Sequence, residues 1–244
     1  MKKIIISASF VMLITFSGCD TAQQVLNSLP NSTTNSGGLT TQQIVAGLKE
    51  ALTVGTQNST SQLSALDGFF KNAAIKILMP PEAQKVVSTL QSVGLGSVVD
   101  KAVLSMNRAA EDAAKSATPI FVNAIKQMSI TDAIGILKGG NQAATNYFKS
   151  KTTSALMTAF KPAVSKALQQ TDATKYWNDV FTVYNQFSTN KVNTDLTAYV
   201  TGKAIDGIFY QVGQEEIKIR QDPAARVTDI LKKVFGSSLA TSGS

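Results

Sequence analysis

The chain contains no histidine and only one cysteine, Cys19. Without an imidazole it lacks the base of a Ser-His-Asp triad or a Cys-His pair, and it lacks the usual zinc ligands. A metal site would need oxygen ligands alone, and the sequence contains no Asp-rich calcium loop. Glycine patterns of the P-loop and dinucleotide-binding types are also missing. We therefore expect neither a bound metal nor a cofactor.

Arginine is also scarce, at three residues among the 23 basic side chains, and the lysines lie scattered along the chain. The formal net charge is +7 over 244 residues. Nucleic-acid-binding domains gather their basic side chains into a patch or stripe, which this sequence does not do. The charge pattern therefore argues against a nucleic-acid partner.

The start of the chain has the pattern of an export signal. Two lysines precede an apolar run from Ile4 to Phe16, and Ser17-Gly18 leads to Cys19. This run is shorter than the about 20 apolar residues that span a membrane. The stretch resembles a bacterial lipobox, with Phe16 where leucine is commonest, and the resemblance implies acylation of Cys19 at the mature N-terminus. An ordinary secretory signal is the alternative.

These features predict a bacterial cell-envelope protein, facing the periplasm or the cell surface, whose membrane contact is an N-terminal lipid. Residues 1–18 form the signal in this interpretation. Two or three acyl chains would anchor the protein stably, because each buried methylene contributes about 0.8 kcal/mol. Loss of Lys2 and Lys3 with the signal leaves 21 basic and 16 acidic side chains, a net charge of +5.

The mature chain is predicted to divide into three parts. Residues 19–38 are rich in Ser, Thr, Asn, Gln and Gly, which predicts a flexible tether. Residues 39–236 are long enough for one domain with a sizeable core. Residues 237–244 repeat the composition of the tether and predict a disordered tail. With Cys19 used by the anchor no disulfide is available, so the core must stabilise the domain.

Apolar residues recur at helical spacing almost throughout the domain, which predicts a single irregular all-α fold of eight to ten helices. The central helix is predicted to be Asp195–Gln221, because its apolar side chains cover more than half of its circumference. Helix starts are predicted at Thr40, in a capping box with Gln43, and at Ser129. Asp172–Phe187 carries an aromatic cluster that we interpret as core packing.

Three segments interrupt the helical pattern. Phe69–Met79 is the least helical stretch and predicts an extended excursion. Pro119 predicts a break at the end of a helix over Gly96–Thr118. Pro162 predicts a kink or break within a helix over Asn141–Gln170.

Four motifs carry a family resemblance: MNRAAEDA (Met106–Ala113), AATNYFKSKTT (Ala143–Thr153), DLTAYVTGKAIDGIF (Asp195–Phe209) and EEIKIRQDPAARVTDILKKVFG (Glu215–Gly236). With these motifs in order, the chain from about Ala46 to Gly236 resembles the bacterial family catalogued as domain of unknown function 4197. The resemblance implies an exported or lipid-anchored helical protein. It implies no activity, substrate or catalytic residue.

All three arginines lie in these motifs beside carboxylates. Glu216 and Arg220 stand four residues apart, the spacing of a helical ion pair. Glu215 falls on the apolar side of its helix, where an isolated carboxylate is costly, so we predict Arg226 or Arg108 as its partner. The candidate buried ion-pair network contains six residues: Arg108, Glu111, Glu215, Glu216, Arg220 and Arg226.

The helix that carries MNRAAEDA has a polar face formed by Asp100, Asn107, Arg108 and Glu111. The simplest interpretation is a solvated face. Leu104 projects among these polar groups, which indicates that part of this face is covered.

Three hypotheses for function follow. In the favoured one the charged groups fix helix register, and the protein is a binding or scaffolding module that contacts an envelope protein. In the second, Glu111 and either Glu215 or Glu216 act as acid and base on a glycan or peptide, although no motif selects these carboxylates. In the third, the helices enclose an apolar pocket for a lipid or another hydrophobic small molecule.

Overall fold

Eight α-helices and two short 3-10 helices make up the described part of the chain, which contains no strand. The computed structural model describes residues 40–94, 96–170, 195–226 and 228–236, with scattered positions between 171 and 194. The elements are α2 (Thr41–Ser64), η1 (Pro81–Ala83), α3 (Gln84–Ser92), α4 (Gly96–Ala114), α5 (Ala117–Gln127), α6 (Ile130–Lys138), α7 (Ala143–Gln169), α9 (Leu196–Gln221), η2 (Pro223–Ala225) and α10 (Asp229–Phe235). The prediction of an all-α fold is confirmed. The predicted signal, tether and tail lie outside the described residues.

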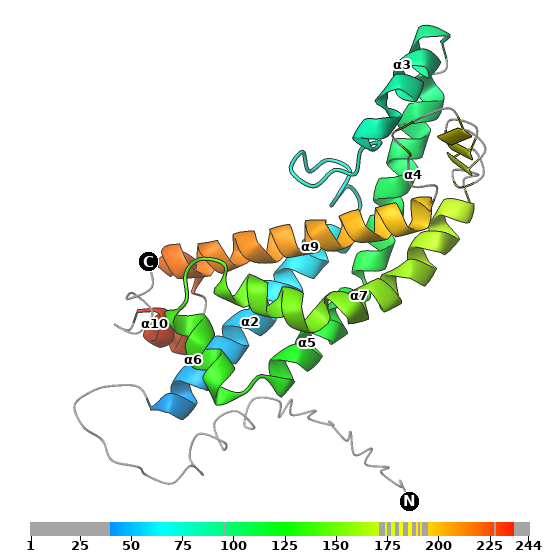
Figure 1. Cartoon of the computed structure of the whole chain (residues 1–244). Helices are drawn as coiled ribbons and strands as arrows, with labels where there is room; N and C mark the ends of the chain where they lie inside the picture. Colours follow the sequence, from blue (N-terminus) through cyan, green and yellow to red (C-terminus); the bar gives the residue numbers. More distant parts are fainter. Residues whose placement is uncertain are drawn as a thin grey trace, which may run out of the picture. The chain divides into compact units, whose positions relative to one another are not determined.

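The central position predicted for Asp195–Gln221 is also confirmed. α9 packs against α2, α4 and α7 (Figure 1). The seven side chains on its broad apolar surface are all at most 4% exposed. They are Leu196, Val200, Ala204, Ile205, Ile208, Phe209 and Val212. A helix that is apolar over most of its circumference is stable only when other helices cover it, and three helices do so here.

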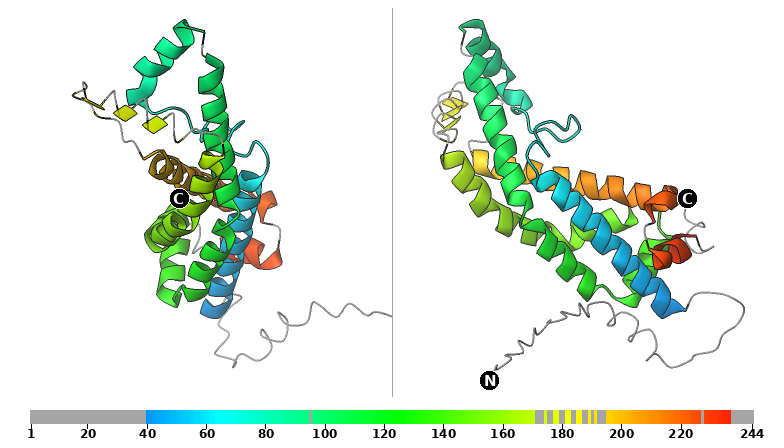
Figure 2. Two further views of the ribbon diagram at one scale, coloured as in Figure 1. Left: turned by 90° about the vertical axis from the view of Figure 1, so that its right-hand side faces the viewer. Right: turned by 180° about the vertical axis from the view of Figure 1, so that it is seen from behind.

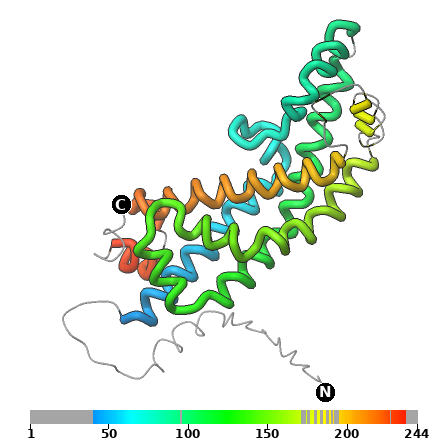
Figure 3. Tube along the Cα trace, viewed as in Figure 1, coloured from blue at the N-terminus to red at the C-terminus, as the bar shows by residue number. Residues whose placement is uncertain are grey.

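The remaining helices pack around this centre. α5 lies between α2 and α7, while α6 and α10 pack on α2 at one end of the described unit (Figure 3). α3 lies at the opposite end, where it packs back on α4 as a helical hairpin (Figure 2). The turn of this hairpin contains Gly94 with φ of 82°, a left-handed conformation that glycine adopts readily. No single described helix is long and apolar enough for a membrane span; only α5 and α6 together reach that length and composition, with a 106° bend between them.

Both predicted capping boxes are present. The backbone N–H of Gln43 donates to Thr40 Oγ1 at 3.2 Å, and the Thr40 N–H donates to Gln43 Oε1 at 2.9 Å. At the start of α6, Ser129 and Asp132 exchange the equivalent pair of bonds. Each box satisfies backbone donors that have no partner within the helix.

Neither of the two helix prolines marks a break in a helix. α4 ends at Ala114 and α5 begins at Ala117, so Pro119 is the third residue of α5 instead of marking its boundary. The backbone N–H groups of the first helical turn have no acceptor within the helix. Proline, which has no N–H, therefore breaks no helical hydrogen bond at this position. α7 runs without a break through Pro162, whose side chain is exposed.

The predicted extended excursion is irregular. We call residues 65–80 the α2–η1 segment; it consists of turns and bends and forms no strand. Phe69 is fully buried and Ile77 is 2% exposed, so two side chains fix the segment to the core. Asp67 adopts φ of 68° within it, a left-handed conformation that Asp tolerates better than most residues.

Only part of the predicted aromatic helix Asp172–Phe187 lies among the described residues. Trp177 and Phe181 are both buried, with ring centroids 4.4 Å apart. The Trp177 ring also stacks on Tyr199 of α9, at 6.3 Å. Tyr176, Val180 and Tyr184, which belong to the same prediction, lie outside the described residues.

Candidate functional site

Glu111 on α4 binds the backbone of the α2–η1 segment. Its Oε1 accepts the N–H groups of Phe69 at 3.1 Å and Phe70 at 3.2 Å. Its Oε2 accepts from Arg108 at 2.6 Å, and the second Arg108 nitrogen donates to Asp67 at 2.6 Å. We call Asp67, Arg108 and Glu111 the loop cluster. It ties a non-helical segment to a helix through charge-assisted hydrogen bonds, which are stronger than neutral ones.

Two further side chains hold the same segment. The Asn107 side chain accepts from the Ile77 N–H at 2.9 Å and donates to the Ile77 carbonyl at 2.8 Å. The Tyr199 hydroxyl donates to the Leu78 carbonyl at 2.9 Å. Burial raises the pKa of Tyr199, with the charge of Glu82 adding to the effect, so this hydroxyl keeps its proton and remains a donor.

The solvated polar face expected on α4 is therefore partly wrong. Asn107 is fully buried and Glu111 is 4% exposed, because the α2–η1 segment covers them. An irregular segment placed against the core carries N–H and C=O groups that need partners. The amide of Asn107 and the carboxylate of Glu111 supply those partners.

The charges of the loop cluster stabilise one another. The pKa of Asp67 is lowered by its hydrogen bond with Lys71 and then by its bond with Arg108. The pKa of Arg108 is raised by its bonds with Glu111 and Asp67. Both shifts favour the ionised forms of Asp67 and Arg108, so these two groups are poorly suited to exchange protons with a substrate near neutral pH.

Glu216 on α9 occupies the start of α7. Its carboxylate accepts the N–H groups of Ala144 at 3.0 Å and Thr145 at 2.9 Å, and the Thr145 hydroxyl at 2.8 Å. Gln142, the residue before the helix, provides no side-chain cap. Glu216 therefore caps α7 from another helix, and its negative charge lies at the positive end of the α7 dipole.

Arg220 completes this arrangement at the end of α6. Its Nε and Nη2 donate to Glu216 Oε1 at 3.0 and 2.9 Å, and Nη2 also donates to the Ile136 carbonyl at 2.8 Å. Ile136 lies in the last turn of α6, where carbonyls have no partner within the helix. We call Glu216, Arg220, Ala144 and Thr145 the helix-end cluster. One ion pair thus caps the end of α6 and the beginning of α7.

Glu215 and Arg226 do not pair as predicted. Glu215 is 6% exposed, as its wheel position indicated, and its carboxylate contacts Lys218 at 3.9 Å. Arg226 instead donates to the carbonyls of Ile219 at 3.1 Å and Arg220 at 2.8 Å, in the last turn of α9. A C-terminal turn presents free carbonyls at its negative dipole end, which attract a guanidinium as a carboxylate does.

The six predicted network residues consequently fall into separate groups. Arg108 and Glu111 belong to the loop cluster, Glu216 and Arg220 to the helix-end cluster, and Glu215 and Arg226 to neither. An acid–base pair must face one cleft, and Glu111 shares a cluster with neither of its proposed partners, Glu215 and Glu216. The described residues also hold no group of three acidic or cysteine side chains that could bind a metal ion.

The sequence patterns did not single out Asp67 or Thr145. Asp67 precedes a glycine and indicated only a turn, while Thr145 lies in a motif that contains no carboxylate. Their partners are 41 and 71 residues away in the chain, beyond the reach of helical spacing. No local signal in the sequence pointed to these contacts.

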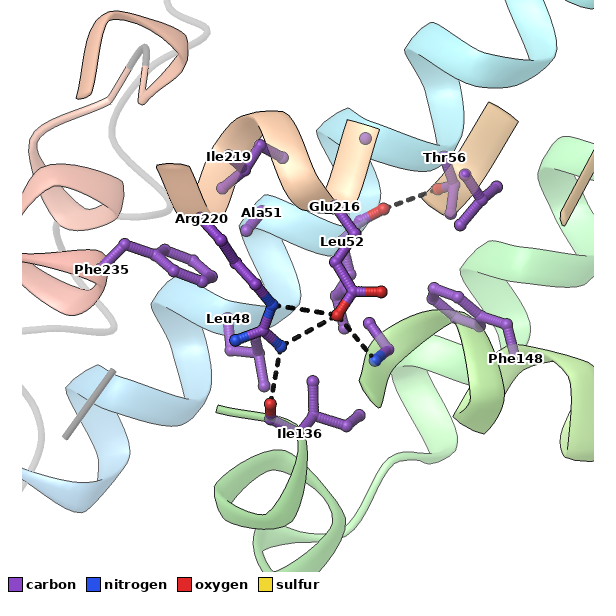
Figure 4. A pocket seen from close by; sticks show the side chains of 13 residues that line it. Leu48, Ala51, Leu52, Thr56, Ile136, Phe148, Glu216, Ile219, Arg220 and Phe235 are labelled. Atoms are coloured by element: carbon purple, nitrogen blue, oxygen red, sulfur yellow. Dashed lines mark hydrogen bonds and ion pairs between the residues drawn. The ribbon is translucent and has the colours of Figure 1, made fainter. Parts of the chain in front are cut away.

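Two cavities lie beside these clusters. The smaller one, between Leu52, Phe148 and Glu216, has a volume of about 20 Å³ (Figure 4). This volume suffices for about one water molecule. The larger one has a volume of about 1080 Å³ and lies among α3, α4, the end of α7 and the start of α9.

We call the larger space the α3–α4 cavity. Its lining is mainly apolar and includes Val87, Leu90, Val98, Leu104, Trp177 and Phe181. Met79 of the α2–η1 segment and Arg108 of the loop cluster also line it. The polar residues of α4 therefore secure one wall of this cavity.

The comparison with protein families shows to which family the chain belongs. The family model described as protein of unknown function (DUF4197) matches residues 38–236, so the chain belongs to this family. No curated protein and no solved structure matches the chain. The resemblance predicted from the four motifs is confirmed.

Proposed function

We propose that this member of the DUF4197 family is a lipid-anchored protein of the bacterial cell envelope that binds a hydrophobic small molecule in the α3–α4 cavity. The observation that carries the binding proposal is the cavity itself, at about 1080 Å³ with a mainly apolar lining. Ligand-binding pockets commonly have volumes of about 300–1,000 Å³ and apolar walls with a few polar groups. The cavity is slightly larger than this range and has walls of this kind.

The apolar side chains around the cavity support a hydrophobic ligand. Val98 is 44% exposed and Leu104 is 36% exposed, although both line the cavity. Burying apolar surface contributes about 25 cal/mol for each Å² removed from water, so a hydrophobic occupant would gain free energy here. Met79 and Met106 add flexible side chains that adapt to ligands of varied shape.

The charged motifs have a structural role in this proposal. The loop cluster holds the α2–η1 segment, which contributes Met79 to the cavity wall. The helix-end cluster fixes α6 and α7, and the far end of α7 contributes Lys166 and Ala167. A pocket built between helices needs this kind of support to keep its shape.

Tryptophan fluorescence tests the binding proposal directly, because Trp177 is the only tryptophan and lines the cavity. A long-chain bromoalkane should quench Trp177 in the purified full-length protein with saturable dependence on concentration. Ala102→Phe, which adds a ring to the cavity lining, should weaken this binding by about tenfold. Ala155→Phe, on an exposed position of α7, should bind like the parent. Absence of saturable quenching, or equal binding by Ala102→Phe, would contradict the proposal.

The anchor is tested through the single cysteine. Cells fed an alkyne-bearing fatty acid should incorporate it into the parent protein, and Cys19→Ser should abolish the incorporation. A lipid group bonded to the Cys19 sulfur through a thioether also blocks the thiol, so the denatured mature protein should not react with a maleimide. A mature protein with a free Cys19 thiol would rule out the lipid anchor.

A further inference from the structure

Among the described residues, four charged side chains line the α3–α4 cavity, and two of them are already neutralised by ion pairs. Arg108 is bonded to Glu111 and Asp67 at 2.6 Å each, and Asp112 is bonded to Lys115 at 2.8 Å. The other two are Lys101 and Lys166.

Lys101 on α4 and Lys166 on α7 are exposed and line the cavity from two different helices. Neither forms an ion pair with any carboxylate of the described residues. Lysine covers apolar surface with its methylene stem while its ammonium group stays in water. The uncompensated charge of the described lining residues is therefore positive, and it comes from flexible groups next to an apolar space.

From this geometry we infer that the ligand is a single-chain anionic amphiphile, a long-chain fatty acid, with its alkyl chain in the α3–α4 cavity and its carboxylate beside Lys101 and Lys166. This inference rests on the proposed function and adds the chemistry of the head group. The cavity volume of about 1080 Å³ is slightly above the usual range for small-molecule pockets, so a long alkyl chain has room in it. Arg108, the one guanidinium in the lining, already binds two carboxylates, so a fork for a phosphate head group is not available.

The test compares two brominated probes that differ only in the head group, a fatty acid and the matching fatty alcohol. Quenching of Trp177 in the full-length protein gives the affinity of each. The acid should bind about tenfold more tightly than the alcohol, the combined effect of two exposed ion pairs. Added salt should reduce this difference, because exposed charges are screened.

The double variant Lys101→Gln/Lys166→Gln should lose the preference for the acid and keep the affinity for the alcohol. Lys232→Gln/Lys233→Gln removes the same charge on α10, which packs on α2, and should keep the preference. Equal binding of acid and alcohol by the parent would overturn the inference while leaving the proposed function intact. Failure of both probes to quench would overturn both. A brominated two-chain phospholipid that binds more tightly than the fatty acid would overturn the choice of a single-chain ligand.

Discussion

Glu216→Ala is expected to lower the free energy of unfolding by about 3–5 kcal/mol, the cost of leaving one partner of a buried ion pair without its counter-charge. The side chains of Glu216 and Arg220 are only 6% and 9% exposed. The substitution removes the counter-charge of the Arg220 guanidinium. It also leaves the N–H groups of Ala144 and Thr145 without their acceptor. Urea denaturation of the full-length protein measures the effect. Amide hydrogen exchange in the first turn of α7 should also accelerate.

Two companion variants separate this mechanism from a general loss of charge. Asp206→Ala removes an exposed carboxylate from the same helix and should change stability by less than about 0.5 kcal/mol. Glu216→Ala/Arg220→Leu removes both buried charges and should be more stable than Glu216→Ala alone. A double variant less stable than the single one would show that the stranded charge is not the cause.

The parts of the fold that follow from local periodicity were predictable from the sequence. The apolar surface of α9 is nearly continuous around the helix, so its central position could be inferred before any partner was known. The capping boxes at Thr40 and Ser129 depend on residues three positions apart. The pairing of Glu216 with Arg220 depends on one helical turn.

The contacts that shape the clusters are long-range, and periodicity does not encode them. Glu111 was a candidate, yet its partners Phe69 and Phe70 contribute backbone N–H groups, which are the same for every residue type except proline. Arg226 also binds backbone carbonyls, and every residue has a carbonyl, so the sequence does not mark which ones it binds. This explains why Arg226 was predicted to pair with Glu215, although it binds backbone carbonyls of α9 instead.

The sequence allowed an apolar pocket to be predicted but did not indicate where the α3–α4 cavity would lie. An apolar pocket was one of three hypotheses, but its walls come from six separate parts of the chain, including Met79, Trp177 and Leu196. A cavity is the space that helices leave between them, so it depends on the helix arrangement and not on any one pattern. The sequence contains the lining residues without indicating that they meet.

Gly207→Ala is expected to have the second large effect on stability, because the buried ring of Phe69 lies directly on α9 at this glycine. A Cβ atom added at Gly207 would come within 2.5 Å of Phe69 Cε1. The Phe69 ring cannot move away from an added methyl group, because the side chain is fully buried and the Phe69 N–H is bonded to Glu111. Gly207→Ala should therefore destabilise the protein by about 1–3 kcal/mol despite the better helix propensity of alanine.

Gly202→Ala is the matched control on the same helix, because a Cβ there meets nothing within 4 Å. It should stabilise the protein by up to about 1 kcal/mol through helix propensity. Phe69→Ala alone should cost about 3–5 kcal/mol. In that background the clash is gone, so Gly207→Ala should turn from destabilising to neutral or stabilising. Should Gly207→Ala remain destabilising without the Phe69 ring, close packing of the α2–η1 segment on α9 would not be the reason for glycine at this position.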